Sequence, residues 1–172
     1  VHTGLLFGVA TKNLRYLVGD NVDVAFNIDV NDFKNQQNVE MIIRDLRPAK
    51  CERDVIAQHL YKYNEIICLN GKVRASDIPT RNEFAQIFTT LKGMVESLIS
   101  TDERLEIHIP KLVKKSAKLH SNLLPIYKVM IIMDVFSEMG LIDVVCTPSP
   151  SVRTINTKHI PPAKKVNLDD SP

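Results

Sequence analysis

Four lysines with helical spacing form the clearest chemistry-bearing pattern in this chain. They lie at i, i+3, i+4 and i+7 and are Lys111, Lys114, Lys115 and Lys118. This spacing places them on one face of a helix, with the apolar or small residues 112, 113, 116 and 117 on the other side. Like charges at these spacings lower helix stability, which raises the hypothesis of a face that contacts phosphates and is neutralised by nucleic acid. The alternative is a solvated surface helix.

The charges around this face favour contact with phosphates over readout of bases. No Asp or Glu occurs between Glu106 and Asp134, and Lys128 adds a further positive charge. No arginine, the side chain that reads guanine through a bidentate contact, accompanies these lysines. Phosphate contacts without base contacts suit binding that does not depend on sequence.

Other candidate nucleic-acid contacts lie outside this segment. Phe33 and Tyr16 are candidate platforms for base stacking. Arg44 and Arg47 stand near the end of a predicted strand, where they would follow a DNA backbone. Phe33 would otherwise join a local core, and the two arginines would otherwise form surface pairs with Asp45 and Asp20. A second basic group near the C-terminus comprises Arg153 and Lys158, with Lys164 and Lys165 beyond them, although lysines in such a tail otherwise only increase solubility.

The residues needed for hydrolytic metal chemistry are scattered. Two-metal sites need clustered carboxylates and imidazoles, but the five histidines are far apart and no Asp-His-His run occurs. Asp169 and Asp170 are adjacent, yet they lie in a Pro- and Lys-rich tail that suits a solvated end. The three cysteines form no C-x-x-C pair, which argues against zinc and favours reduced thiols in or near the core. We therefore expect no catalytic site and no metal site in this chain.

Composition restricts the protein to a broad class. The chain has 172 residues, 44% hydrophobic and 24% charged, which fits a globular protein of one domain or two small ones. The net charge of +2 means that any nucleic-acid footprint is local. No apolar run reaches the ~18 residues that a membrane span needs, and the first residues lack a signal-peptide pattern. The chain starts without Met inside a predicted strand, which suggests a fragment of a longer protein.

The first part of the sequence predicts a small β-rich segment. Apolar and polar residues alternate over 22–28 and again over 39–43, which is typical of two strands, with a polar connection at 31–38. A short strand is expected at 5–7 and a brief helix or turn at 14–19. Residues 49–78 have only weak helical spacing at 53–63 and an apolar run at 66–69, so we expect a connector there.

A second unit starts at residue 79. Thr80 and Glu83 have the spacing of a capping box, and apolar residues then recur with helical spacing from 84 to 98. A strand at 105–109, a helix from Pro110 to 119 and a helix at 124–139 ending before Gly140 follow. Strands at 141–146 and 152–160 flank a turn at 147–150. This order of elements is that of a winged helix.

Motifs in both parts resemble the C-terminal region of the RecJ family of single-stranded-DNA exonucleases, of the Gram-positive type. They are VDVAF at 22–26, NDF at 31–33, DLRP at 45–48, PTRNEF at 79–84, MDVFSEMGL at 133–141 and KVNLDDS at 165–171. They occur in the family's order along nearly the whole chain. One departure is that a glycine of the family's hairpin connection is replaced here by residue 35, 36 or 37.

The resemblance implies an α+β protein with part of an OB-type β-barrel at 1–48, a connector at 49–78 and a winged-helix-like domain with a tail at 79–172. It implies a bacterial, cytoplasmic parent enzyme of DNA repair and recombination, which hydrolyses single-stranded DNA from the 5′ end with manganese or magnesium. This chain would lack the catalytic core and would bind or orient single-stranded DNA. The alternatives are a module that docks the exonuclease to repair proteins and a winged-helix regulator of duplex DNA. The second alternative is disfavoured because the expected recognition helix at 124–139 carries Lys128 as its only cation.

Overall fold

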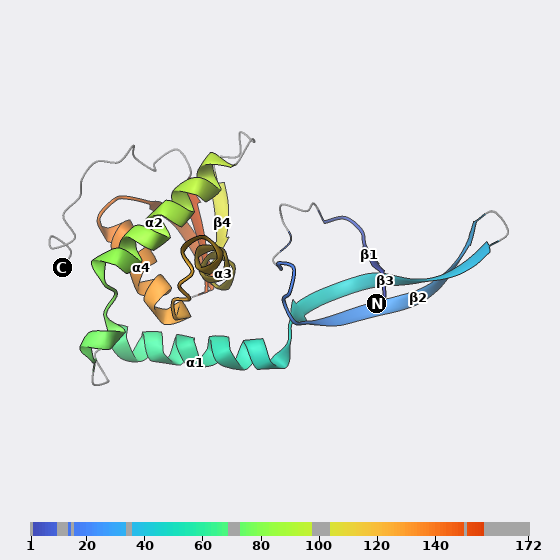
Figure 1. Cartoon of the computed structure of the whole chain (residues 1–172), viewed down its shortest axis with the longest axis horizontal. Helices are drawn as coiled ribbons and strands as arrows, with labels where there is room; N and C mark the ends of the chain where they lie inside the picture. The colour runs from blue at the N-terminus through green and yellow to red at the C-terminus, as the bar shows by residue number, and fades with distance from the viewer. Residues whose placement is uncertain are drawn as a thin grey trace. The chain divides into compact units, whose positions relative to one another are not determined.

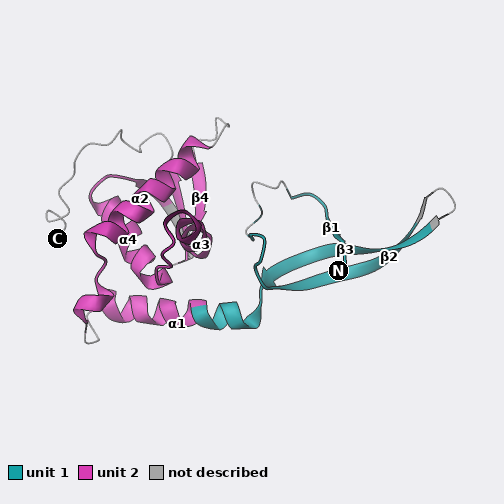
Figure 2. Cartoon of the chain, viewed as in Figure 1, with its two compact units in different colours: residues 1–55 teal, residues 56–172 magenta. Residues whose placement is uncertain are grey.

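The computed structural model describes residues 2–9, 14, 16–33, 36–68, 73–97, 104–149 and 151–156. The chain is mixed α/β and divides into two compact units, Val1–Val55 and Ile56–Pro172 (Figure 2). The boundary falls inside helix α1 (Lys50–Ile67), so the first turns of this helix are counted with the first unit. Each unit contains one three-stranded sheet (Figure 1).

The sheet of the first unit has the strand order β1-β3-β2. Strand β2 (Val22–Phe33) and strand β3 (Gln36–Pro48) form an antiparallel hairpin, and strand β1 (Gly4–Leu6) runs parallel to β3 at Met41–Ile43. The three expected strands are therefore present. The described strands do not close into a barrel. Between β1 and β2, residues 17–20 form a turn, in which Gly19 has φ +95°.

The polar connection predicted at 31–38 is wrong. The two strands extend through most of it, with Asn31 paired to Asn38 and Phe33 to Gln36. A two-stranded ribbon needs only backbone hydrogen bonds and tolerates polar side chains on both faces; here the Nδ2 of Asn31 donates to the Oε1 of Glu40 at 3.0 Å. Phe33 is consequently a strand residue and not a loop residue. Its side chain and the connecting residues 34–35 lie outside the described part of the chain.

The segment expected to be a connector is largely helical. Helix α1 occupies 18 residues of it, and a 3-10 turn, η2 (Ala75–Asp77), follows. The periodicity was weak because α1 has no fully buried residue; only Ile56, Leu60 and Tyr63 pack, partly buried, against the core of the second unit. Polar contacts add to this attachment, since Lys62 pairs with Asp77 at 3.2 Å.

The second unit has the predicted order of elements. Helix α2 (Arg81–Glu96), strand β4 (Arg104–His108), helix α3 (Ile109–His120) and helix α4 (Ile126–Glu138) precede strands β5 (Asp143–Ser149) and β6 (Val152–Asn156). The antiparallel sheet has the order β4-β6-β5, and Figure 1 shows the helices gathered beside it. The core is made by apolar side chains of α2, α3, α4 and β6, among them Ile87, Leu112, Met130, Phe136 and Ile155.

Strand β5 starts and ends later than the strand predicted at 141–146. Strand β5 continues to Ser149, through Pro148, where a turn was expected at 147–150. Proline removes a backbone donor and is tolerated mainly on edge strands, and β5 is an edge strand of the described sheet. The two shifts of register between β5 and β6 fall in the same stretch, next to Cys146.

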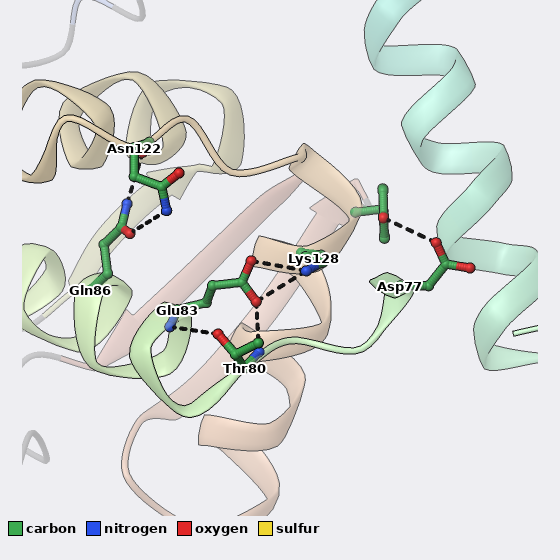
Figure 3. Close-up of polar contacts among 7 residues, drawn as sticks. Asp77, Thr80, Glu83, Gln86, Asn122 and Lys128 are labelled. Carbon is green, nitrogen blue, oxygen red and sulfur yellow. Dashed lines mark hydrogen bonds and ion pairs between the residues drawn. The ribbon is translucent and has the colours of Figure 1, made fainter. Parts of the chain in front are cut away.

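The ends of two helices follow the sequence signals. The hydroxyl of Thr80 accepts from the N–H of Glu83, whose carboxylate accepts from the N–H of Thr80 at 2.6 Å, so the predicted capping box is confirmed (Figure 3). At the end of α4, Gly140 has φ +65° and the N–H of Leu141 donates to the carbonyl of Phe136 at 2.8 Å. This is a Schellman arrangement, which needs a residue in the left-handed region after the helix.

Glu83 also forms the principal buried ion pair of the second unit. The Nζ of Lys128 on α4 lies 2.9 Å from Oε1 and 3.1 Å from Oε2 of Glu83 (Figure 3). The side chain of Lys128 is 10% exposed and that of Glu83 is 15% exposed. One carboxylate thus caps α2 and neutralises a cation of α4.

Replacing Glu83 by Gln should lower the free energy of unfolding by about 3 kcal/mol or more, because it leaves the charge of Lys128 buried without a counterion. Thr80→Ala removes only the cap and should cost about 1 kcal/mol. Urea denaturation measures both. Glu96→Gln is the control, since the exposed Lys92–Glu96 pair at 3.8 Å should contribute less than about 1 kcal/mol. Equal effects of Glu83→Gln and Glu96→Gln would contradict the role of the buried pair.

Stability should also fall in acid through Glu83. Burial favours the neutral acid, but the N–H of Thr80 and the ammonium of Lys128 outweigh it and lower the pKa of Glu83. A pKa below that of the unfolded chain, about 4.3, means that the stabilisation is present above that pH and is lost as the pH falls through the folded-state pKa. Urea titrations from pH 6 to pH 3 should show a smaller loss in Glu83→Gln than in the wild type. The same pH dependence in both would show that the carboxylate contributes nothing.

Candidate nucleic-acid interface

The lysine pattern lies on α3 as the spacing predicted. Ile109, Leu112, Val113 and Ser116 of this helix are buried in the core. The four lysines are on the remaining surface, with Lys111, Lys114 and Lys115 partly exposed and Lys118 exposed. The helix starts with Pro110 in its first turn. We name the lysine-bearing surface, Lys111, Lys114, Lys115 and Lys118, the α3 face.

Side-chain hydrogen bonds among Gln86, Ser116 and Asn122, which we name the Gln86–Asn122 lock, hold α3 against α2. The Nε2 of Gln86 donates to the Oγ of Ser116 at 2.9 Å and to the carbonyl of Asn122 at 3.0 Å. The Nδ2 of Asn122 donates back to the Oε1 of Gln86 at 3.0 Å (Figure 3). Gln86 is 8% exposed, so these bonds satisfy an amide that would otherwise be costly to bury. The lock holds the C-terminal part of α3, which carries Lys118, in one orientation.

Two of the predicted contact residues are structural cations instead. Lys128 is 8% exposed and Arg153 is 6% exposed. Lys128 is neutralised by Glu83, and the guanidinium of Arg153 lies 3.1 Å from Oδ1 of Asp134. A buried and neutralised cation offers no free charge to a phosphate, so both are withdrawn from the candidate interface. Lys158, predicted with Arg153, lies outside the described residues.

Asp134 joins three elements through this pair. The hydroxyl of Tyr63 on α1 donates to its Oδ2, while Arg153 on β6 binds its Oδ1. Burial, together with the hydrogen bond to Asp134, raises the pKa of Tyr63 to about 12, so this hydroxyl remains a donor at physiological pH. The network attaches α1 and β6 to α4 through the carboxylate of Asp134.

Helix α4 is a core helix. Seven of its 13 residues are buried: Ile126, Lys128, Val129, Met130, Ile132, Met133 and Phe136. Its only cation is the buried Lys128, and Glu138 is exposed. A helix that reads the major groove needs exposed donors facing the bases. The surface of α4 offers no Lys, Arg, Asn or Gln side chain for this purpose.

In the first unit, two candidate residues share a pocket. Tyr16 and Arg44 line an open pocket of about 250 Å³ together with Leu6, Val9, Leu14, Asp45 and Leu46. The hydroxyl of Tyr16 donates to the carbonyl of Leu46 at 2.9 Å. Arg44 is exposed. Tyr16 and Arg44 therefore line the same pocket, which their separation in the sequence did not predict.

Arg47 is partly committed to an ion pair. Its Nε lies 3.4 Å from Oδ2 of Asp23, and the same oxygen lies 2.8 Å from the guanidinium of Arg53. The hydrogen bond from Arg53, with the charges of both arginines, lowers the pKa of Asp23. The alternative interpretation, in which Asp45 or Asp20 pairs with Arg47, named the wrong partner, because Arg47 pairs with Asp23 directly opposite it across the hairpin.

The described residues contain no group of three or more His, Cys, Asp or Glu side chains that could hold a metal. Within the same residues, no helix has the length and apolarity to cross a membrane. Cys51 and Cys68 are free and exposed, which corrects the expectation that they lie in or near the core. The side chain of Cys146 is outside the described part of the chain.

Comparison of the chain with protein-family models, with curated proteins and with solved structures gives no match.

The two classes of cation should separate by their effect on stability. Arg153→Gln should lower the free energy of unfolding by about 3 kcal/mol, because Asp134 would keep its charge in a partly buried site without its partner. Lys118→Gln, on the exposed end of the α3 face, should change it by less than about 0.5 kcal/mol. Urea denaturation of the two variants checks this. A large loss in Lys118→Gln would show that the α3 face is structural.

Proposed function

We propose that this chain is the non-catalytic C-terminal region of a RecJ-type 5′-to-3′ single-stranded-DNA exonuclease of bacterial DNA repair and recombination. In this proposal, it binds or orients single-stranded DNA for a cytoplasmic enzyme. The hydrolysis of phosphodiester bonds, with manganese or magnesium, belongs to a catalytic core outside this chain. The proposal is supported by the order of the motifs along the sequence.

The observation that carries the binding role is the α3 face. Four lysines occupy eight consecutive residues of one helix, on the surface left by its buried stripe. The helix itself contains no Asp or Glu. Lysines are point charges that attract phosphates without reading base identity. A face of this kind suits an enzyme that must process any sequence.

A winged-helix-like arrangement of the second unit forms part of the proposal. Its support is the element order α2, β4, α3, α4, β5, β6, with β5 and β6 as the terminal hairpin. The burial of α4 favours a non-specific role over that of a duplex-reading regulator, because the helix that would enter the major groove has no exposed cation. In the proposed arrangement α3, and not α4, faces the DNA.

A protein-docking role remains the second candidate, and one observation favours it. The β2–β3 hairpin exposes large apolar side chains, including Ile28 at 68% and Val39 at 73%. Contiguous apolar surface of this kind marks interaction sites. The two roles use different units of the chain and are separable by experiment.

Fluorescence anisotropy of a labelled single strand of about 20 nucleotides, titrated with the protein at several salt concentrations, tests the DNA-binding role. Each phosphate contact contributes about 0.7 to the log–log salt slope for single strands. Lys115→Gln/Lys118→Gln should therefore reduce the slope by about 1.4. A duplex of the same length should compete poorly.

Lys50→Gln/Lys92→Gln is the matched control, because it removes the same charge from exposed positions on α1 and α2. It should leave the slope within experimental error of the wild type. No binding at low salt, or equal losses in the two double variants, would refute a role of the α3 face in DNA binding.

A further inference from the structure

One face of the β2–β3 hairpin is apolar and open to solvent. Val24, Phe26, Ile28 and Val30 alternate along β2 and are 40%, 45%, 68% and 56% exposed. Register places Phe26 opposite Ile43, Ile28 opposite Met41 and Val30 opposite Val39. Directly opposed residues lie on the same face of an antiparallel pair, so these side chains form one continuous surface. We name it the apolar hairpin face.

The opposite face of the hairpin carries an unfavourable pair of acids. Asp29 on β2 lies directly opposite Glu40 on β3. Like charges in this position destabilise a sheet. The Oε1 of Glu40 accepts from Asn31, and the Oδ1 of Asp29 accepts from the N–H of Val30. Both described bonds come from neutral donors, so neither compensates the repulsion with a positive charge.

The free edge of the hairpin lies beside these acids. Strand β2 is 12 residues long and forms an edge of the described sheet, whereas β1 covers the other side of β3. An edge strand presents backbone N–H and C=O groups that can pair with a further strand. An added strand would place its side chains alternately on the apolar hairpin face and beside Asp29.

We propose that the β2 edge binds an extended peptide strand of a partner protein, in which apolar residues alternate with Lys or Arg. The apolar residues cover Phe26, Ile28 and Val30, and a basic residue lies beside Asp29 and relieves its repulsion with Glu40. Backbone pairing supplies affinity, and the alternation of the partner's side chains supplies specificity.

The charge of β2 favours a basic peptide strand over a second copy of this chain and over nucleic acid. The sequence of β2, VDVAFNIDVNDF, contains three aspartates and no Lys or Arg. A second copy pairing through β2 would therefore add acids to this face and no cation. Nucleic acid would bring phosphates to the same acids. A basic, apolar strand is complementary to both faces of the hairpin.

The probe is a labelled nine-residue peptide with Lys at odd positions and Val at even positions, titrated against the full chain and followed by anisotropy. We expect saturable binding. Methylation of alternate backbone nitrogens on the edge-facing side should abolish it, because it removes donors without changing side-chain charge. The peptide with Glu in place of Lys should not bind. Equal binding of the methylated peptide would overturn the proposal, since charge alone would then explain the affinity.

Two variants locate the site. Asp29→Asn should weaken peptide binding about threefold, which corresponds to one exposed ion pair, and should not destabilise the hairpin because it removes a repulsion. Glu96→Gln, which removes an exposed acid from α2, should have no effect. Ile28→Lys should abolish binding while leaving the DNA salt slope of the α3 face unchanged, so this result is independent of the proposed DNA role.

Sedimentation of the protein without peptide tests the competing occupant. Concentration-dependent dimers that Ile28→Lys abolishes would assign the apolar hairpin face to a second copy and would overturn the proposal. An unchanged peptide affinity in both Asp29→Asn and Ile28→Lys would do the same, because the peptide would then bind elsewhere. A monomer whose peptide affinity depends on both residues supports it.

Discussion

The packing of the helical unit depends on the carboxylate of Glu83. It completes the first turn of α2 through the N–H of Thr80 and compensates the charge of Lys128 within α4. A helix start and a helix–helix contact are therefore fixed by one group. Because Lys128 lies among core residues, α4 could not pack with its apolar residues buried unless that charge were neutralised. The Gln86–Asn122 lock extends the same principle to α3, with amides in place of charges.

The two units solve the problem of burial differently. The second has a continuous core with several side chains at 0% exposure, such as Ile87, Ile132 and Ile155. The first has none of the buried hydrophobic residues of the described chain, and its sheet leaves apolar side chains partly exposed. The two units therefore support different kinds of surface. The α3 face is basic on a well-packed support, whereas the hairpin combines apolar residues with acids on an open sheet.

Local signals made much of the second unit predictable from sequence. The capping box, the proline before α4, the glycine after it and the lysine spacing on α3 each act within a few residues. The burial and ion pairing of Lys128 and Arg153 were not predictable in this way, because their partners Glu83 and Asp134 are 45 and 19 residues away. The residues next to a lysine or arginine in the sequence do not show which distant acid will neutralise it.

The length of helix α1 was not predicted for a related reason. Its side chains are only partly buried, against a core formed by distant residues, so its hydrophobic periodicity is weak. The polar residues around Asn31 predicted a connection where the structure has paired strands, because turn-forming side chains are also compatible with an exposed two-stranded ribbon.

The two exposed cysteines lie at opposite ends of α1, so the distance between them reports whether this helix is continuous. Cys51 stands in its first turn, counted with the first unit, and Cys68 directly follows its last residue, counted with the second. Seventeen residues of uninterrupted helix would separate the two sulfur-bearing positions by ~25 Å along the axis. With Cys146 replaced, spin labels at these natural thiols would report whether the helix remains unbroken across the unit boundary, and whether a ligand of either unit alters that continuity.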